Sequence, residues 1–553
     1  MTLSRRAFVA ASSGILVSSF VRAAQNNNAD IVIIGGGTGG VAAALAACRG
    51  GAKKVIMTEE TDWIGGQLTS QLVPPDENHS IESGGGTKSY RDFRTAVRLH
   101  YRKRTERAMR PDFRDTTNLN PGNGWVSRLC HEPRVAVMVL EETLKPFVAN
   151  GQLTIHRQCV PISATLKGDR VESVTLLDRR TGNNFTLSGD YFIDATEEGD
   201  LLPLAKVEYV TGSESKAMTG EPNAADKPRP NNIQSFTWCF ILEHDDGNEH
   251  VIDEPKDYDF WKSFPNADKP LFQWNDPEFS FYPKGDRDPE ATKPNFWTYR
   301  RVIDSKMFVP GSYVGDVSVI NWHMNDYTLG SLHGSTPEKA AEHRERSRQM
   351  SMALVYWLQT ESPRSDGKKG WPGLRLCPEQ TGTKDGLAMA AYIRESRRIK
   401  ADFTILEQHV SKPIRDREFG KDKATAEPFK DSVGIGHYLY MDLHQTSEGE
   451  KKGGSQVYPF QIPLGALLPV RVRNVLPACK NLGVTHLTNG CYRLHPVEWN
   501  IGEAAGALAA YCIAKDLEPK QVRADAKRLA DYQDQLTKLG LLLEWPANSI
   551  RKF

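Results

Sequence analysis

The sequence has few cysteines for its length, and their spacing excludes several classes of protein. Only eight occur among 553 residues, and no two of them form a C-x-x-C pair. Zinc ribbons, thioredoxin-like motifs and ferredoxin clusters therefore lack their usual ligands. So long a chain is also not held together by a dense disulfide framework. We interpret the cysteines as small buried hydrophobic residues, with a disulfide as an open alternative for an exported protein.

An excess of charge of either sign is also missing. The 70 Lys and Arg residues and 69 Asp and Glu residues give a formal net charge of +1. Such a balance supplies no overall attraction for nucleic acid or for an anionic membrane, so we expect neither as a partner. No long apolar run follows the N-terminal segment, and we expect no integral membrane contact. The length and the 39% hydrophobic composition are those of a folded chain with several domains.

The first residues have the pattern of an export signal. Residues 4–8 read SRRAF, an apolar stretch continues to about Phe20, and small residues precede a cleavage position after Ala23. Paired arginines at this place are typical of the twin-arginine signal, which directs the export of folded proteins. We predict a signal peptide over residues 1–23 and a periplasmic or secreted protein; an ordinary or anchored signal is the alternative.

A glycine-rich turn joins an expected strand at 30–34 to an Ala-rich helix at 41–48. Gly35, Gly37 and Gly40 in this turn fit the pattern G-x-G-x-x-G. The first glycine permits a tight turn, the second lets the backbone approach a pyrophosphate, and the third lets helix and strand pack closely. We therefore predict a bound dinucleotide. The predicted contacts in this turn are Gly35, Gly37, Thr38, Gly39 and Gly40.

A carboxylate follows at the spacing that dinucleotide-binding folds use. A second expected strand, 54–58, ends at Glu59, about 20 residues after the glycine turn, where an acidic side chain holds ribose hydroxyls. A purely structural glycine turn would not explain this acid. The sequence Gly65-Gly66-Gln67 comes next and resembles the second glycine turn of FAD-binding proteins. We therefore predict FAD, with Gly66 and Gln67 among its contacts.

Two later segments resemble places where FAD-binding chains return to the cofactor. An apolar run over 191–196 ends in Asp-Ala-Thr, and an Ala-rich helix is expected to open at Gly502 after a strand and turn at 474–480. In such folds the last helix directs its N-terminus at the flavin, where its positive end stabilises negative charge. The contacts predicted from these segments are Asp194, Ala195, Thr196, Gly502 and Ala505.

Together these segments resemble the FAD-dependent oxidoreductases of the glutathione-reductase-like superfamily. The resemblance is strongest for a bacterial branch, some of whose members carry the label xanthan lyase. The matching blocks are spread over nearly the whole chain, from 31–69 to 474–506. The resemblance implies an α/β fold, in which a Rossmann-like FAD-binding domain is discontinuous in sequence and carries an inserted α+β substrate domain. His79 invites a covalent flavin like that of the fumarate-reductase relatives, but its neighbouring residues do not match their pattern, so we expect FAD bound without a covalent link.

The domain organisation follows from these matches and from composition. We predict that a first part of the FAD-binding domain covers 28–215, a substrate or cap domain 216–374, a second FAD-binding part 375–412, an insertion 413–454, a C-terminal FAD-binding part 455–515, and a helical tail 516–553. A capped helix is expected from Thr336 to about Thr360, and a strand from His437 to His444.

Oxidation by a flavin often needs a base that takes a proton from the substrate. His495 is our first candidate and His486 the second, because their segment is expected near the flavin. Arg493 is a candidate for contact with the flavin or with an anionic group of the substrate. For each of these residues a purely structural role is the alternative.

Three residues are candidates for binding the substrate. Asn321 and Asp326 lie in the polar sequence NWHMND, which suits a hydroxylated ligand, although a structural turn fits it equally well. His437 begins the expected strand, one face of which would line the pocket. His437, Asp442 and His444 match no metal-binding spacing closely, so we predict no metal.

The sequence predicts an exported FAD-dependent oxidoreductase that oxidises a polar small molecule by hydride transfer to the flavin, with sugar-derived molecules among the candidates. The alternatives are a FAD-dependent lyase or isomerase acting on polysaccharide, and a flavoprotein whose cofactor is structural. A second G-x-G-x-x-G between strand and helix is missing, which disfavours a dedicated NAD(P)H domain and favours oxygen, a quinone or a protein as electron acceptor. The pattern leaves the choice of acceptor and the oligomeric state open.

Overall fold

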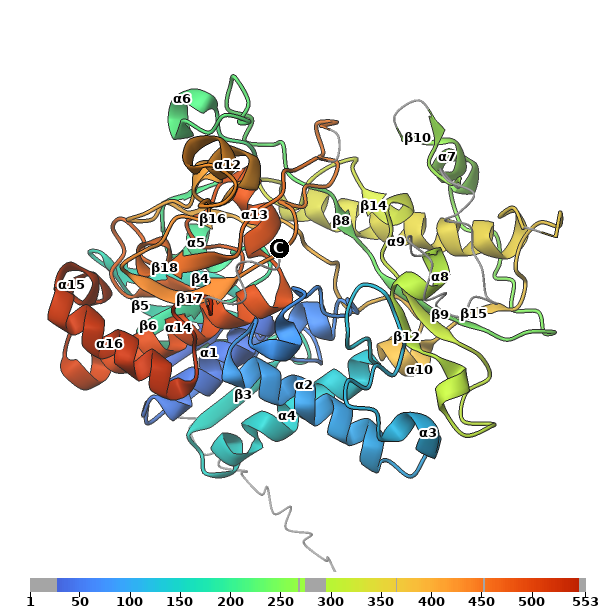
Figure 1. The fold of residues 1–553 in the computed structure, drawn as a ribbon, viewed down its shortest axis with the longest axis horizontal. Coiled ribbons are helices and arrows are strands. Elements are labelled where there is room, and N and C mark those ends of the chain that lie inside the picture. The colour runs from blue at the N-terminus through green and yellow to red at the C-terminus, as the bar shows by residue number, and fades with distance from the viewer. Residues whose placement is uncertain (1–26, 267–268, 274–294, 365, 451–452, 547–553) are drawn as a thin grey trace, which may run out of the picture.

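The computed structural model of the protein describes residues 27–266, 269–273, 295–364, 366–450 and 453–546. The predicted signal peptide at 1–23 lies outside the described residues. Figure 1 shows a large sheet with its helices on the left and a smaller sheet on the right, where the long helix α9 lies across the upper side. In the described part of the chain, no helix has both the length and the hydropathy needed to cross a membrane.

The larger sheet has the strand order β3-β2-β1-β6-β5-β4, and β19 also pairs with β6. Its strands are β1 (Asn28–Ile34), β2 (Val55–Glu59), β3 (Leu153–Arg157), β4 (Cys159–Lys167), β5 (Arg170–Asp178), β6 (Asn184–Asp194) and β19 (Val475–Pro477). β3, β2, β1, β6 and β19 are parallel, whereas β4 and β5 form antiparallel pairs. The apolar run Ile31–Ile34 is buried, as a central parallel strand requires. The expected Rossmann-like α/β fold is confirmed.

Two helices of this lobe pack closely against each other because glycines lie at their contact. They are α1 (Thr38–Arg49) and α14 (His495–Lys515). A Cβ on Gly502 would lie only 2.0 Å from the carbonyl oxygen of Gly39, and one on Gly506 only 2.1 Å from that of Ala43. The expectation that a helix opens at Gly502 is wrong: α14 begins seven residues earlier, with Pro496 in its first turn, where proline favours helix initiation.

The smaller sheet is antiparallel, with the order β12-β13-β9-β15. Its strands are β9 (Phe240–His244), β12 (Arg301–Ile303), β13 (Val317–Ile320) and β15 (Leu374–Leu376). The sheet therefore continues past residue 374, where we placed the end of the substrate domain, because β15 pairs along β9. Helix α9 (Pro337–Thr360) has the predicted cap, since the Thr336 hydroxyl accepts a hydrogen bond from the Lys339 N–H.

Other elements complete the two lobes. The remaining helices are α2 (Lys88–Lys103), α3 (Pro111–Arg114), α4 (Pro133–Ala149), α5 (Leu201–Leu204), α6 (Lys216–Thr219), α7 (Tyr258–Ser263), α8 (Phe296–Tyr299), α10 (Pro378–Thr381), α11 (Glu407–Val410), α12 (Lys412–Phe419), α13 (His486–Tyr492), α15 (Pro519–Ala524) and α16 (Ala526–Leu539). Short strand pairs are β7 (Tyr209–Val210) with β16 (Arg398–Ile399), β8 (Phe236–Thr237) with β14 (Asp326–Tyr327), β10 (Pro265–Asn266) with β11 (Lys269–Pro270), and β17 (Ser432–Gly436) with β18 (Phe460–Pro463). The helical tail is thus present as α15 and α16.

Two local expectations have clear outcomes. All eight cysteines lie in the described part of the chain, and each is a buried free thiol. The strand expected over 437–444 is wrong: β17 ends at Gly436, and beyond it only isolated bridges hold Tyr440 to Gln456 and Leu443 to Gly453. Because there is no continuous ladder, the side chains do not alternate between two faces. Odd- and even-numbered residues of this segment therefore reach the same cavity.

Candidate active site

A narrow groove lies at the carboxyl ends of β1, β2 and β6, where Rossmann-like folds bind their ligands. Six of the predicted cofactor contacts line it: Gly35, Gly37, Glu59, Gly66, Ala195 and Thr196. Residues that the sequence analysis did not assign also line it: Gly36, Glu60, Ser70, Gln71, Cys159, Val160, Pro161, Glu197 and Asp200. The groove therefore gathers the two glycine turns, the acid after β2 and the end of β6 at one place.

The glycines of the first turn serve different physical needs. Gly35 has a φ of +98°, and a Cβ there would lie 2.3 Å from the Ala195 carbonyl oxygen, so both backbone and space require glycine. Gly37 has an ordinary φ of −61°, and its Cβ would meet only the flexible end of Glu197, 2.8 Å away. The fold would therefore accept a side chain at Gly37, but that side chain would fill the crevice beside it.

This crevice holds an anionic group in the structure. The Oε1 atom of Glu197 lies between Gly37 and Gly66 and has no hydrogen-bond partner there. Its other oxygen is ion-paired with the buried Lys480, and the N-terminus of α1 begins at the next residue, Thr38. Helix N-termini and nearby ammonium groups favour phosphate oxygens in the same way. The crevice therefore has the chemistry that a cofactor diphosphate needs.

Glu59 occupies the predicted place at the end of β2. Its Oε2 accepts a hydrogen bond from the Gly36 N–H at 3.1 Å, and its Oε1 accepts from Thr61. Burial and the neighbouring Glu60 raise the pKa of Glu59 to about 8. Ribose hydroxyls that donate to this carboxylate would favour its charged form, so binding would release a proton.

Replacement of Glu59 by alanine is expected to weaken FAD binding about ten- to a hundredfold, because charge-assisted hydrogen bonds are lost. Wild-type affinity should also rise with pH between about pH 6 and 8, since the bound form needs the carboxylate that the free form protonates; the variant should lose this rise. Titration of the FAD-free protein with FAD measures both. Glu142→Ala, which removes an exposed acid outside the groove, is the control, and an equal loss in both variants would contradict the special role of Glu59.

Other predicted cofactor residues lie behind the groove and support it. The Thr38 hydroxyl donates to the Gly65 carbonyl at 2.9 Å and ties the two glycine turns together. A Cβ on Gly39 would collide with the Ala478 carbonyl, and one on Gly40 with that of Gly35. The Asp194 carboxylate accepts hydrogen bonds from Thr196. Gly502 and Ala505 are buried on α14, away from the groove.

Gln67 connects the groove to a much larger cavity. Its neighbour Gly66 lines the groove, and its side-chain amide donates to the carbonyl oxygen of Arg493, at 3.2 Å, and to Glu498. Arg493 lines the cavity, just before α14 begins. Gln67 therefore links a residue of the groove to a residue of the cavity wall through one side-chain contact.

The cavity has a volume of about 860 Å³, within the range of small-molecule and cofactor sites. Aromatic side chains form much of its wall: Trp125, Tyr299, Trp322, Tyr392, Tyr438 and Tyr440. Polar and charged side chains form most of the remainder: Asp76, Glu77, Asn78, His79, Arg300, Asn321, His323, Arg394, His437, Asp442, His444 and Arg493; Val126, Leu439, Gly453 and Gly454 complete the lining. These residues come from both lobes, so the cavity lies between them.

Alternating charges run along one wall of the cavity. Arg493 pairs with Asp442 at 3.0 Å, and the same Asp442 oxygen lies 3.3 Å from Nε2 of His444. The other ring nitrogen of His444 lies 2.7 Å from Asp326, which also pairs with Arg394 at 2.9 Å. Burial favours neutral Asp326, but Arg394 and His444 outweigh it and lower its pKa. These ion pairs neutralise Arg394 and Arg493, two of the three arginines of the cavity.

Asp76, which follows the pair Pro74-Pro75, was not among the residues predicted from the sequence. Its side chain is buried in the cavity wall, and Oδ1 has no hydrogen-bond partner. The next residue, Glu77, is fixed by an ion pair with the buried Arg94, which holds this loop in place. Burial raises the pKa of Asp76, although Arg300 and Arg493 oppose the shift. The polar sequence Asp-Glu-Asn-His after two prolines was the available signal.

The predicted catalytic histidines do not line the cavity. His495 lies behind it: Nδ1 accepts a hydrogen bond from the Asp76 N–H at 2.9 Å, and burial lowers its pKa to about 3. His486 lies in a buried ion cluster, 3.1 Å from both oxygens of Glu395; burial opposes its charge, but Glu395 prevails and raises its pKa. Both sit on helices that the sequence analysis did not place at these residues.

The predicted substrate residues differ in their access to the cavity. Asn321 lines it and accepts a hydrogen bond from Arg394 at 3.1 Å. Asp326 does not line the cavity but lies behind its wall, where it contacts Arg394 and His444. His437 lines the cavity, packs edge-on against Trp545, and has its pKa lowered to about 4 by burial. Arg493 also lines the cavity, as predicted for contact with flavin or substrate.

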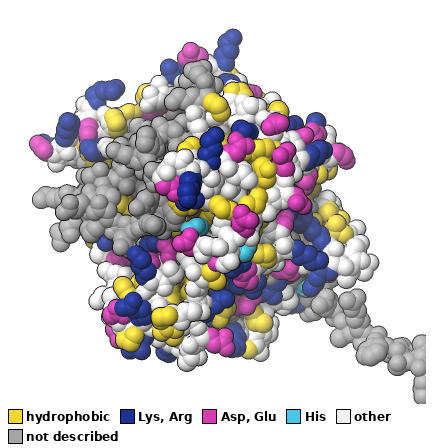
Figure 2. All heavy atoms as spheres, turned by 90° about the vertical axis from the view of Figure 1, so that its right-hand side faces the viewer, with side chains coloured by type: hydrophobic (Ala, Val, Ile, Leu, Met, Phe, Trp, Pro, Cys, Tyr) yellow, Lys and Arg dark blue, Asp and Glu magenta, His cyan; other side chains and the backbone are white. Residues whose placement is uncertain are grey.

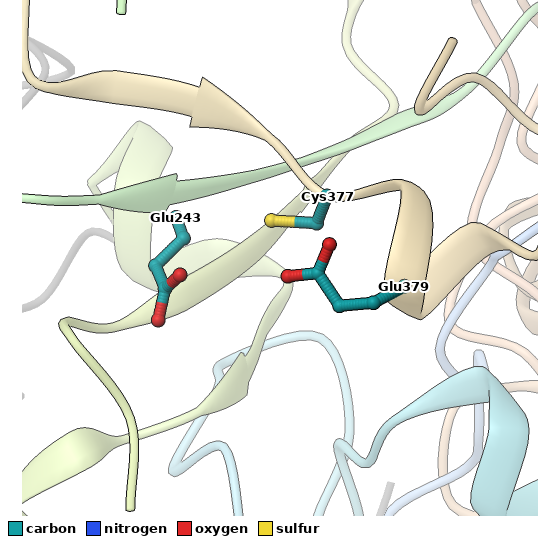
Figure 3. Close-up of side chains that lie close together, drawn as sticks. All are labelled: Glu243, Cys377 and Glu379. Atoms are coloured by element: carbon teal, nitrogen blue, oxygen red, sulfur yellow. The ribbon is translucent and has the colours of Figure 1, made fainter. Parts of the chain in front are cut away.

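A group outside the cavity has the composition of a metal site. Figure 3 shows Glu243, Cys377 and Glu379 close together, with the two carboxylates and the thiol turned toward one another. Arg375 already neutralises both carboxylates, at 2.8 Å from Glu243 and 2.6 Å from Glu379. Burial raises the pKa of the Cys377 thiol far above its usual range, which makes it a poor ligand. The ion pairs account for this group without a metal.

Figure 2 shows lysines and arginines interspersed with aspartates and glutamates over the face that it displays. This face carries no broad patch of one sign, consistent with the net charge of +1. The absence of a nucleic-acid partner stays a prediction.

Comparison with solved structures finds flavoproteins at low similarity. A flavin-dependent monooxygenase, PieE, in complex with FAD and substrate shares 15% identity over 40% of this chain and 36% of its own, with a TM-score of 0.23. The glycerol-3-phosphate dehydrogenase of Bacillus halodurans complexed with FAD shares 14%, over 40% of each chain, with a TM-score of 0.23. A mutant of E. coli quinol fumarate reductase FrdA shares 10% identity over 92% of this chain and 74% of its own, with a TM-score of 0.31.

No curated protein matches the chain significantly. The family model described as FAD dependent oxidoreductase matches residues 30–536, which include both glycine turns, the groove and every residue that lines the cavity. The chain belongs to the FAD-dependent oxidoreductase family, and its cofactor is FAD.

Proposed function

We propose that the enzyme oxidises a polar small molecule in the 860 Å³ cavity, with sugar-derived molecules among the candidates. The observation that carries the proposal is the buried Asp76 carboxyl, whose Oδ1 has no partner in the wall of that cavity. When bound, FAD supplies a hydride acceptor. Asp76 would take the proton from a substrate hydroxyl, and the aromatic walls would pack against the carbon skeleton.

The surrounding residues prepare Asp76 for this role. Its backbone is held by His495 on one side and by the Glu77–Arg94 pair on the other, so the carboxyl is fixed in place. Burial raises its pKa and makes it a stronger base than an exposed aspartate. Arg493 lies in the same wall and is held by Asp442, where it can orient polar atoms of the ligands.

Anaerobic mixing of the FAD-loaded enzyme with a panel of sugars, sugar acids and polyols tests the proposal. A substrate should bleach the yellow flavin absorbance and leave a carbonyl product. Turnover without any change in the flavin would instead support a lyase or isomerase. A panel that neither reacts nor bleaches the flavin would argue for a structural cofactor.

We also infer export by the twin-arginine route. The proposal is supported by the SRRAF sequence at residues 4–8 and by the need to bind FAD in a folded state. Fractionation of bacterial cells that express the full chain tests it: the mature protein should be periplasmic or secreted with FAD bound, and a cytoplasmic, uncleaved protein would contradict the inference.

A further inference from the structure

Arg300 differs from the other two arginines of the cavity because, among the described residues, no carboxylate forms an ion pair with it, whereas Arg394 and Arg493 each have one. It follows α8 and lines the cavity, where its Nη1 donates to the Asn321 carbonyl oxygen at 2.7 Å. Its guanidinium also stacks on the Tyr299 ring, 4.8 Å from the centroid. Its Nε is buried without a hydrogen-bond partner, as are those of Arg394 and Arg493. Arg300 therefore presents to the cavity a fixed cation without an ion-pair partner, and the Asp76 carboxyl acts on it only at longer range.

The contrast with its neighbours makes this arrangement informative. Arg394 donates to Ser235, Thr237 and Asn321 and pairs with Asp326, while Arg493 is engaged by Tyr392 and Asp442. A structural arginine in a buried wall is normally neutralised in this way, because an unpaired buried charge is costly. Arg300 lacks that partner although it faces a cavity wide enough for a ligand. The geometry therefore indicates that an anionic group of the ligand is the missing partner of Arg300.

From this we propose that the substrate carries a carboxylate, which Arg300 binds, so that the enzyme acts on a sugar acid or a comparable polyhydroxylated acid. This inference rests on the proposed function and names its substrate class. Guanidinium groups bind carboxylates through paired, charge-assisted hydrogen bonds. The aromatic rings of Tyr299 and Trp322, in edge contact at 5.5 Å beside Arg300, form an apolar wall for the carbon skeleton.

The charge balance of the cavity favours a singly charged group over a phosphate. Asp326 neutralises Arg394, Asp442 neutralises Arg493, and Arg94 neutralises Glu77. Arg300 is then the cation left for the ligand, and the Asp76 carboxyl lines the same cavity. One carboxylate matches one guanidinium, whereas a dianionic phosphate would add repulsion from Asp76. Arg300 lowers the pKa of Asp76, and a bound carboxylate would offset that effect and make Asp76 a stronger base.

The test compares matched ligands by calorimetric titration of the FAD-loaded enzyme. The pairs are glucuronate with glucose and galacturonate with galactose, in which a carboxylate replaces a hydroxymethyl group, together with glucose 6-phosphate. Each acid should bind about ten- to a hundredfold more tightly than its neutral partner. Equal binding of acids and neutral sugars would overturn the proposal, and tighter binding of glucose 6-phosphate would overturn the choice of carboxylate over phosphate.

Variants of Arg300 test whether this residue causes the preference for acids. Arg300→Gln keeps a donor for the Asn321 carbonyl and should abolish the preference for each acid over its neutral partner. Arg300→Lys should keep part of the preference, which also covers the case in which the glutamine variant does not fold. Arg110→Gln, an exposed arginine paired with Asp112, is the control and should behave as wild type. A preference for acids that survives Arg300→Gln would contradict the assignment.

Reduction of the flavin separates this inference from the proposed function. Bleaching by neutral sugars alone would leave the oxidation in place and refute the carboxylate. Acids that bind through Arg300 but never reduce the flavin would support the binding site and refute oxidation of this class of compound. Bleaching by an acid that loses its affinity in Arg300→Gln supports both.

Discussion

Replacement of Asp76 by asparagine is expected to slow reduction of the flavin by substrate about 10²–10⁴-fold, the usual contribution of a positioned base. Asparagine has the same size but does not accept a proton. The carboxyl lies in the cavity wall with Oδ1 free, and its backbone is anchored by His495. FAD binding should be unchanged, because the glycine turns and Glu59 are untouched. Stopped-flow absorbance of the flavin measures the rate under anaerobic conditions.

The pH dependence of this rate provides a second sign of a base. Burial raises the pKa of Asp76 above its ordinary value, so the wild-type rate should fall as the pH drops through that raised pKa, where the base becomes protonated. Asp76→Asn should lose this fall, and Asp76→Glu should restore part of the rate. Asp92→Asn, on the surface, is the control. A wild-type rate in Asp76→Asn would move the role to another group, of which His437 is the next in the wall.

Gly37→Val is expected to give a folded protein that is purified without FAD. The φ of −61° at Gly37 suits any residue, and its Cβ meets only the flexible end of Glu197, so the fold should tolerate the change. The valine side chain would instead fill the crevice between Gly37 and Gly66 and exclude the diphosphate. Circular dichroism and the flavin absorbance of the purified protein measure the two effects separately.

Gly40→Val is the informative comparison for this experiment. A Cβ at Gly40 would lie 2.2 Å from the Gly35 carbonyl oxygen, so this variant should fail to fold rather than fold without cofactor. A yellow Gly37→Val protein with a full complement of FAD would contradict the assignment of the crevice. Loss of the fold in both variants would show that the crevice is part of the packing.

The groove was predictable because its signals are local in the sequence. A β-branched strand, a glycine turn and an acid after the next strand each act within a few residues, and they specify the place where parallel strands end. Among the elements predicted for the FAD-binding fold, the start of α14 was misplaced. Gly502 was expected to open that helix, but its role is to let α14 approach Gly39 on α1, a contact between residues that are far apart in the chain.

The cavity was only partly predictable because it is assembled from distant segments. Asp76, Arg300, Tyr392 and Asp442 come from four loops, and no spacing in the sequence indicates that they meet. Arg493 was found because it lies near recognisable C-terminal motifs, and His437 because the residues that follow it alternate like a strand. His495 was chosen as a base from its position in the chain, but its ring turns toward the backbone of Asp76. We now expect His495→Ala to slow reduction less than Asp76→Asn, because His495 acts only through that backbone contact.

The central claim is that substrate is oxidised in this cavity by transfer of electrons to FAD. The most direct measurement is a single anaerobic turnover with the best substrate of the panel, in which carbonyl product and reduced flavin are quantified together. The account predicts one carbonyl formed for each flavin reduced in the wild type, and neither on the same timescale in Asp76→Asn. Product formed while the flavin stays oxidised would contradict it.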